Sequence, residues 1–164
     1  MPFRIDPATE DDVSIILSFI KELADFEHLA HEVVATEDGI LAALFSTRPV
    51  AEACIGRYDG EPVAFALFFS SFSTFLGRPG LYLEDLYVRP EFRGRGFGRR
   101  LLIHLARQAR DRGCGRVEWS VLDWNSRAIE SYRRVGAVPM DEWTTYRLTG
   151  DALDRLADEG ADED

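Results

Sequence analysis

Apolar residues recur three and four positions apart in two early stretches of the chain, and this spacing predicts two amphipathic helices. The first helix covers about residues 10–25, and Thr9 with Asp12 resembles a capping box at its start. The second helix begins at Thr36 and ends before Pro49. The apolar positions behind both predictions are Val13, Ile16, Leu17, Ile20, Leu23, Ile40, Leu41, Leu44 and Phe45.

Short runs of β-branched and aromatic residues, each bounded by turn residues, predict six strands. The runs cover residues 3–5, 51–58, 62–71, 81–88, 116–122 and 143–148. Asp59-Gly60 is the strongest turn signal, and it predicts a β-hairpin between the second and third strands. Residues 77–80, Gly-Arg-Pro-Gly, predict a further turn.

Two later helices complete the pattern. One covers Leu101–Ala109, and the other begins at Asn125 or Ser126 and is stopped by Gly136. The order β-α-α-β-β-β-α-β-α-β predicts an α/β (α+β) fold in a single domain over residues 1–164, with a mixed, mostly antiparallel sheet flanked by helices. The acidic residues from about 158 to 164 are expected to be frayed.

The composition restricts the partners of the chain. Its 164 residues, 46% of them hydrophobic, make up one ordinary domain. The formal net charge of −10 disfavours nucleic acid and membrane as partners, and it fits either a cationic substrate or simple solubility. No apolar run approaches the ~20 residues that span a bilayer. Neither Cys54 nor Cys114 has metal-ligand spacing, so we expect a reduced, cytoplasmic protein without a metal site.

A glycine-rich stretch, Arg93–Arg100, lies between the predicted strand 81–88 and the helix that follows it. Glycines leave backbone N–H groups open, and the first N–H groups of a helix lack internal partners and carry partial positive charge. Such a turn captures phosphate, and the four arginines of the stretch would reinforce it. The stretch therefore predicts a pyrophosphate-binding loop.

Other kinds of loop fit these residues less well. A dinucleotide-binding fingerprint needs a glycine where Arg99 stands, and a Walker loop needs a Gly-Lys-Ser/Thr ending, whereas Lys21 is the only lysine in the chain. An Arg-Gly-rich RNA-binding tract stays open as an alternative, although this stretch is brief and lies between regular elements.

One superfamily matches the loop without gaps. Arg93-x-x-Gly96-x-Gly98 after a strand resembles the acetyl-CoA pyrophosphate loop of the GNAT N-acetyltransferase superfamily. Further along the chain, residues 125–136 read Asn-x-x-Ala-x-x-x-Tyr-x-x-x-Gly and resemble a second motif of that superfamily. The Asn, Ala and Tyr of this motif share one helix face, where the small Ala128 leaves room for a ligand beside the Tyr132 hydroxyl.

Several segments spread over nearly the full chain are also similar to the diamine (spermidine/spermine) acetyltransferase family. They are Phe3-Arg4-Ile5 with Pro7-Ala8-Thr9, Ile20–Ala24, Tyr82–Leu86, Asp123–Asn125 and Tyr132–Ala137. The resemblance implies a GNAT-like acyl-CoA N-acyltransferase fold and a cytoplasmic, homodimeric enzyme that moves acetyl from acetyl-CoA directly to a primary amine. A polyamine or diamine acceptor is favoured. The alternatives are a thialysine-like amino acid, another small amine, and a non-catalytic acyl-CoA-binding regulatory module.

The same resemblance implies roles for particular residues. Tyr132 would be the general acid, and Glu84 would relay a proton from the amine through water. Phe26, Glu27, Glu84 and Asp85 would form the acceptor pocket. The residues that would bind acetyl-CoA are Leu86, Tyr87, Val88, Arg93, Gly94, Arg95, Gly96, Phe97, Gly98, Arg99, Asn125, Ser126, Arg127 and Ala128.

Three acceptor positions need comment. Phe26 stands where the family has tyrosine, and Thr74 stands where the polyamine enzymes have an acid. Both departures concern the acceptor rather than the transfer chemistry. Glu84 lies within an apolar strand, where a carboxylate is costly unless it is solvated or paired, and this favours a functional role for it.

Overall fold

The computed structural model describes residues 2–160. The chain divides into two compact units, Met1–Leu122 and Asp123–Asp164. The single domain predicted over residues 1–164 stays a prediction. No helix in the described part of the chain is both long and apolar enough to cross a membrane.

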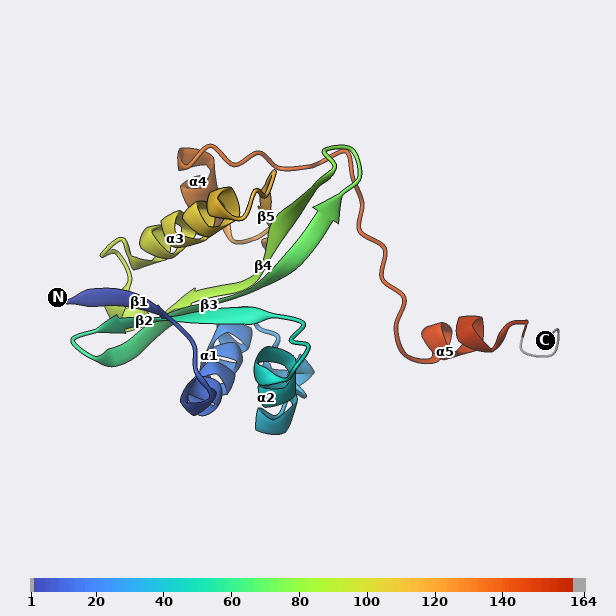
Figure 1. Ribbon diagram of the computed structural model, residues 1–164, viewed down its shortest axis with the longest axis horizontal. Coiled ribbons are helices and arrows are strands. Elements are labelled where there is room, and N and C mark those ends of the chain that lie inside the picture. Colours follow the sequence, from blue (N-terminus) through green and yellow to red (C-terminus); the bar gives the residue numbers. More distant parts are fainter. Residues whose placement is uncertain (1, 161–164) are drawn as a thin grey trace. The chain divides into compact units, whose positions relative to one another are not determined.

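Five strands form one sheet in the first unit, and their order in the sheet follows the sequence (Figure 1). They are β1 (Phe3–Pro7), β2 (Glu52–Tyr58), β3 (Glu61–Ser73), β4 (Arg78–Val88) and β5 (Val117–Trp119). Neighbouring strands are antiparallel except for the parallel pair β4 and β5. The β2–β3 hairpin turns at Asp59 and Gly60, whose φ angles of 49° and 86° suit a two-residue turn. This sheet confirms the predicted fold class.

Three helices cover the two faces of this sheet. Figure 1 shows α1 (Val13–Phe26) and α2 (Glu37–Phe45) on one face and α3 (Phe97–Asp111) on the other. The capping box predicted at Thr9 and Asp12 is present, and the Thr36 hydroxyl accepts a hydrogen bond from the Gly39 N–H at 3.1 Å. Three short 3-10 turns accompany the helices: η1 (Glu10–Asp12), η2 (Ala30–Glu32) and η3 (Pro90–Phe92).

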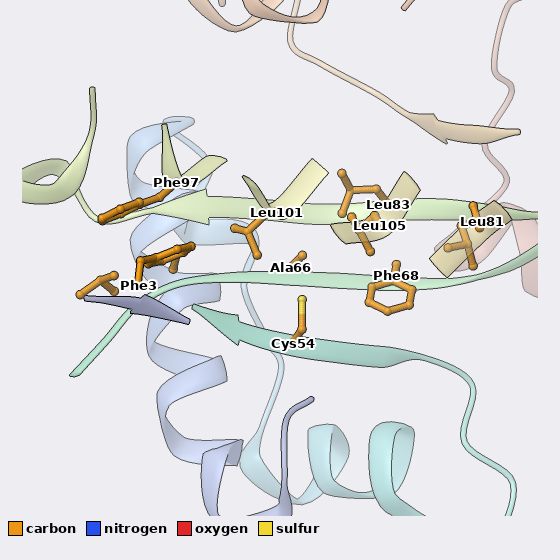
Figure 2. Close-up of a cluster of buried hydrophobic side chains, with 12 residues drawn as sticks. Phe3, Cys54, Ala66, Phe68, Leu81, Leu83, Phe97, Leu101 and Leu105 are labelled. Carbon is orange, nitrogen blue, oxygen red and sulfur yellow. The ribbon is translucent and has the colours of Figure 1, made fainter. Parts of the chain in front are cut away.

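The core between α3 and the sheet fixes where α3 begins. Leu101 and Leu105 are buried against the sheet, as Figure 2 shows. The Phe97 ring stacks on the Phe3 ring with 4.0 Å between centroids, so the first residue of α3 is held against β1. The buried Cys54 belongs to this core, and burial raises the pKa of its thiol to about 12, which argues against a nucleophilic role.

A second core lies between the sheet and α1. It contains Ile16, Phe19, Ile55 and Phe65, and Tyr87 of β4 packs into it. Strand β3 therefore lies between two cores, with Phe65 facing one and Ala66 facing the other.

Two predicted strand boundaries were wrong. Strand β4 begins at Arg78 rather than Leu81, because Pro79 and Gly80 pair with β3 instead of forming a turn. Pairing between β4 and β5 begins only at Leu81, so a proline at position 79 removes no ladder hydrogen bond on that side. Strand β5 is limited to Val117–Trp119, shorter than the predicted run over residues 116–122.

The second unit contains two helices, α4 (Ser126–Arg134) and α5 (Gly150–Asp158). Helix α4 was predicted, whereas the strand predicted over residues 143–148 is absent. A strand needs a pairing partner, and in residues 2–160 none pairs with this segment, where Tyr146 is 94% exposed. Helix α5 was not predicted, and it ends at Asp158, where the predicted frayed tail begins. Residues 161–164 of that predicted tail lie outside the described residues.

Candidate active site

Strand β4 contains a β-bulge at Glu84. Asp85 pairs with Leu67 and Leu83 pairs with Phe68, so Glu84 is the extra residue with no partner on β3. The bulge reverses the alternation of side chains, and Leu83 and Leu86 therefore pack into the same core although they are three residues apart. Without the bulge, Leu86 would face the opposite side of the sheet.

The bulge also determines which backbone N–H and C=O groups of β4 are left without a partner on a neighbouring strand of the described sheet. The Arg89 N–H donates to the Val63 carbonyl at 2.9 Å, which makes this an antiparallel pair of the hydrogen-bonded kind. By alternation, the N–H and C=O groups of Leu86 and Val88 point away from β3. Pairing with β5 stops at Leu83, so no strand in residues 2–160 bonds these groups on that side. The side chain of Tyr87, the residue between them, is buried in the α1 core.

The glycine loop lies beside this open edge. Gly94 and Gly96 have φ angles of 80° and 81°, in the left-handed region that glycine adopts without strain. A Cβ on Gly98 would lie 3.8 Å from the side chains of Leu86 and Val88. The first helical hydrogen bond of this turn runs from the Arg100 N–H to the Gly96 carbonyl, so the N–H groups of residues 97–99 begin α3 without helical partners.

The two glycines at positions 96 and 98 provide a matched test of the loop's backbone. We expect Gly96→Ala to lower the free energy of unfolding by about 1–2 kcal/mol, because an L-residue is strained at φ 81°. Gly98 is helical with room for a methyl group, so Gly98→Ala should be neutral or stabilising by about 0.5–1 kcal/mol. Urea unfolding of the ligand-free variants measures both, and equal destabilisation by the two would contradict the assigned loop conformation.

The arginines of the loop turn toward the protein more than the sequence suggests. Arg93 Nε donates to the Val88 carbonyl at 2.9 Å, and the Arg95 guanidinium lies 5.3 Å from the Tyr58 ring centroid. Arg100 donates to the Phe3 carbonyl at 3.2 Å. Arg95, Arg99 and Arg100 are nevertheless exposed, so their charge stays close to the loop and adds to the attraction of an anion by the backbone N–H groups.

Three carboxylates predicted for the acceptor pocket lie near one another. Burial raises the pKa of Asp85 to about 6, with further contributions from the negative charges of Glu84 and Glu27. Burial also raises the pKa of Glu27, which follows the last residue of α1. From the sequence, Glu84 was expected to be the carboxylate whose burial in the strand costs free energy. Glu84 is exposed, because the bulge turns it out, and Asp85 carries the burial cost.

The second unit carries the other predicted residues on α4. Asn125 is its N-cap, and the Asn125 Oδ1 accepts a hydrogen bond from the Ala128 N–H at 3.3 Å. Asn125, Ala128 and Tyr132 are partly buried, whereas Ser126 and Arg127 are exposed. The helix therefore presents the three motif residues on one face, as their spacing predicted.

Metal ligands are not grouped in the described part of the chain, where no three His, Cys, Asp or Glu side chains are placed to hold an ion.

Comparison with known proteins assigns the family. Residues 17–137 match the Acetyltransferase (GNAT) family. The chain belongs to this family. That membership confirms the predicted enzyme class, an N-acetyltransferase, and acetyl-CoA is the acetyl donor of GNAT enzymes.

Relatives and solved structures agree with this assignment. The chain is 37% identical to the thialysine N-epsilon-acetyltransferase of Bos taurus, covering 93% of this chain and 96% of that protein. It is 34% identical to the Arabidopsis thaliana L-ornithine N5-acetyltransferase NATA1, covering 93% and 87%. It is 28% identical to the human spermidine/spermine N(1)-acetyltransferase-like protein 1, covering 92% of this chain and 23% of that protein. A Vibrio cholerae integron cassette protein superposes with a TM-score of 0.79 at 26% identity, covering 96% of this chain and 98% of that one.

Proposed function

We propose that this GNAT enzyme transfers acetyl from acetyl-CoA directly to a primary amine of a small cationic molecule. A diamino acid of the thialysine or ornithine type is the acceptor we favour, because the relatives at 34–37% identity are named for these molecules. The polyamine acceptor that the sequence resemblance favours stays a prediction, with support from a relative at 28% identity.

The partly buried Asp85 carries this proposal. Its carboxylate is ionised at neutral pH against the cost of burial, and Glu84 and Glu27 add negative charge nearby. No arginine or lysine among residues 2–160 forms an ion pair with any of the three carboxylates. A cationic acceptor would supply the missing positive charge and lower the cost.

The site residues also fit acetyl-CoA. The open N–H and C=O groups of Leu86 would bond the amides of its pantetheine arm, and the first N–H groups of α3 would hold its pyrophosphate. Acetyl-CoA supplies an activated thioester when bound. The protein's own contribution is to orient both reactants and to move protons.

An amine acceptor must lose a proton before it can attack. A group with a pKa near that of lysine, about 10.4, needs roughly 4–5 kcal/mol to reach its neutral form at pH 7. We assign this proton transfer to Glu84 acting through water, since Glu84 is exposed at the bulge and stands next to Asp85. Asp85 and Glu27 would hold the second cationic group of the acceptor.

Glu84→Gln tests the role of Glu84. We expect kcat/KM for the amine to fall about a hundredfold, the low end of the range for general bases, with the affinity for coenzyme A unchanged. Glu61→Gln, at an exposed glutamate of β3, serves as the matched control. Steady-state rates at saturating acetyl-CoA measure both variants, and a Glu84 variant as active as the control would remove Glu84 from the mechanism.

Relative kcat/KM values identify the acceptor. Thialysine, ornithine, putrescine and spermidine differ in whether a carboxylate stands beside the second amine. We expect higher kcat/KM values for the two amino acids, thialysine and ornithine. Higher kcat/KM values for spermidine and putrescine would instead support a polyamine acceptor.

The remaining parts of the proposal concern the setting of the enzyme. We infer a cytoplasmic homodimer without nucleic-acid or membrane partners, as the family resemblance and the net charge of −10 suggest. Phe72 and Phe75, at the tip of the β3–β4 hairpin, are 66% and 94% exposed and support an interface there. Sedimentation of the full chain tests the dimer.

A further inference from the structure

The side chain of Arg93 contacts residues outside the glycine loop. Its Nε donates to the carbonyl of Val88, the last residue of β4, at 2.9 Å. The side chain therefore lies across the end of β4, although the backbone of Arg93 stands directly before Gly94 of the loop. Arg93 thereby links the loop to the strand whose open edge precedes it.

The same guanidinium also contacts Phe26, one of the residues predicted for the acceptor pocket. Its central carbon lies 4.8 Å from the centroid of the Phe26 ring and 5.5 Å from that of Tyr87. Phe26 is the last residue of α1, and Glu27 follows it as the C-cap. Guanidinium groups over aromatic faces are held by cation–π attraction and by stacking of their planes. The backbone of Arg93 thus belongs to the loop, while its side chain contacts both β4 and the end of α1.

The neighbouring arginines make contacts of the same kind with other segments. Arg95 lies over Tyr58 and Phe92, and Arg100 lies over Phe3, with 4.7 Å to its ring centroid. These rings belong to β2, η3 and β1. Arg89, which precedes the loop, also contacts α1, at Phe19 and Glu22, but near the middle of the helix. Of Arg93, Arg95 and Arg100, Arg93 is the one that contacts the end of α1, so Arg95 and Arg100 offer matched controls.

We propose that Arg93 is a positioning residue that couples the glycine loop to the acceptor segment Phe26–Glu27. A ligand that fixes the loop backbone also fixes the position of the Arg93 guanidinium. The guanidinium then holds Phe26, and with it the adjacent Glu27 carboxylate, in place for the amine. This inference rests on the proposed function for the role of Glu27, whereas the coupling itself can be measured without any acceptor.

Hydrogen exchange measures the coupling directly. The amides of Glu27, His28 and Leu29 bond to carbonyls of α1, so their exchange reports on the end of that helix. Coenzyme A should slow their exchange about tenfold in the unaltered chain, a change equivalent to about 1.4 kcal/mol. Arg93→Met should abolish the slowing, and Arg100→Met should preserve it.

Kinetics give a second readout that a purely structural role would not move. At saturating acetyl-CoA, Arg93→Met should raise KM for the amine about tenfold, equivalent to about 1.4 kcal/mol. The KM for acetyl-CoA is measured separately, because Arg93 begins the predicted cofactor loop. Phe26→Leu keeps the Arg93–Val88 hydrogen bond and should give the same change in the KM for the amine. The double variant should add nothing to either single change, because both remove one contact. Arg93→Lys, which keeps the charge but not the planar stacking, should restore the KM only in part.

The outcomes separate this inference from the proposed function. Equal slowing by coenzyme A in the unaltered chain and in Arg93→Met would overturn the coupling, as would the absence of slowing in the unaltered chain. Additive KM changes in the double variant would also overturn it. If the unaltered chain acetylates no amine but the exchange differences appear, the proposed function fails while the coupling stands.

Discussion

Replacing Tyr132 with phenylalanine is expected to leave the affinity for acetyl-CoA intact and to lower kcat about a thousandfold, within the range for a lost general acid. Transfer to the amine releases the sulfur of coenzyme A as a thiolate, and we assign the proton that it takes up to the Tyr132 hydroxyl. The partly buried face of α4 presents this residue together with Asn125 and Ala128. Phenylalanine keeps the ring and removes only the proton donor.

The control for this variant is in the same unit. Tyr146 is 94% exposed and lies outside the motif, so Tyr146→Phe should keep the turnover of the unaltered enzyme. Stopped-flow or steady-state release of thiol measures kcat, and calorimetric titration measures binding. Unchanged turnover in the Tyr132 variant would exclude the tyrosine as general acid and leave water as the proton donor.

Replacing Asp85 with asparagine is expected to stabilise the fold at neutral pH by up to about 3 kcal/mol. The folded-state pKa of about 6 lies above the usual value of 3.8, so folding favours the protonated carboxyl. The stability that this group contributes is fully present below about pH 4 and is lost as the pH rises through about 6. The asparagine side chain does not titrate in this pH range, so the variant does not lose this stability as the pH rises.

Urea unfolding over a series of pH values measures this difference. The Asp85 variant should exceed the unaltered protein in stability at pH 7, and the two should converge as the pH falls toward 4. Asp111→Asn, at an exposed aspartate at the end of α3, is the control and should show no such trend. A difference that is constant with pH would mean that Asp85 is ionised in the folded protein with its ordinary pKa. The gain in stability should come with a loss of amine affinity if Asp85 holds the acceptor.

Much of the first unit could be predicted because its signals are local. Helical spacing, a capping box and the Asp59-Gly60 turn each act within a few residues, and all three are found in the structure. The glycine loop was predictable for the same reason, since its left-handed φ angles at Gly94 and Gly96 require glycine.

The arrangement of β4 could not be predicted from its own residues. Residues 81–88 contain apolar side chains at both odd and even positions, and only pairing with β3 decides where the extra residue falls. That pairing places Glu84 outside and Asp85 inside. The acid directly after Glu84 was a signal that one of the two carboxylates could be buried. The side chains of a strand alternate between its two faces, but this alternation alone does not say which of two neighbouring residues is the buried one.

In the described part of the second unit, one predicted strand is absent and one helix was not predicted. The run from Trp143 to Leu148 has the composition of a strand, yet strand formation depends on a partner outside the run. The α5 helix was missed although Leu153 and Leu156 are three residues apart and Asp151 lies in the first turn. No element was predicted between residue 148 and the acidic end, because this apolar spacing is short.

The contacts of Arg93 were also beyond sequence reasoning. The motif places an arginine at the start of the loop, but the direction of its side chain depends on Phe26, which is 67 positions earlier in the chain. Long-range contacts of this kind follow from the way α1 and the end of β4 pack.

Amine-dependent release of free thiol from acetyl-CoA tests the central claim most directly. The full chain is mixed with acetyl-CoA alone and then with thialysine, ornithine, putrescine, spermidine or an aminoglycoside, and the thiol is titrated over time. We predict rapid release with at least one small diamine or diamino acid and almost none without an amine. Release at the same low rate with and without every amine would contradict the account, and tight binding of coenzyme A in that case would indicate a non-catalytic acyl-CoA-binding module.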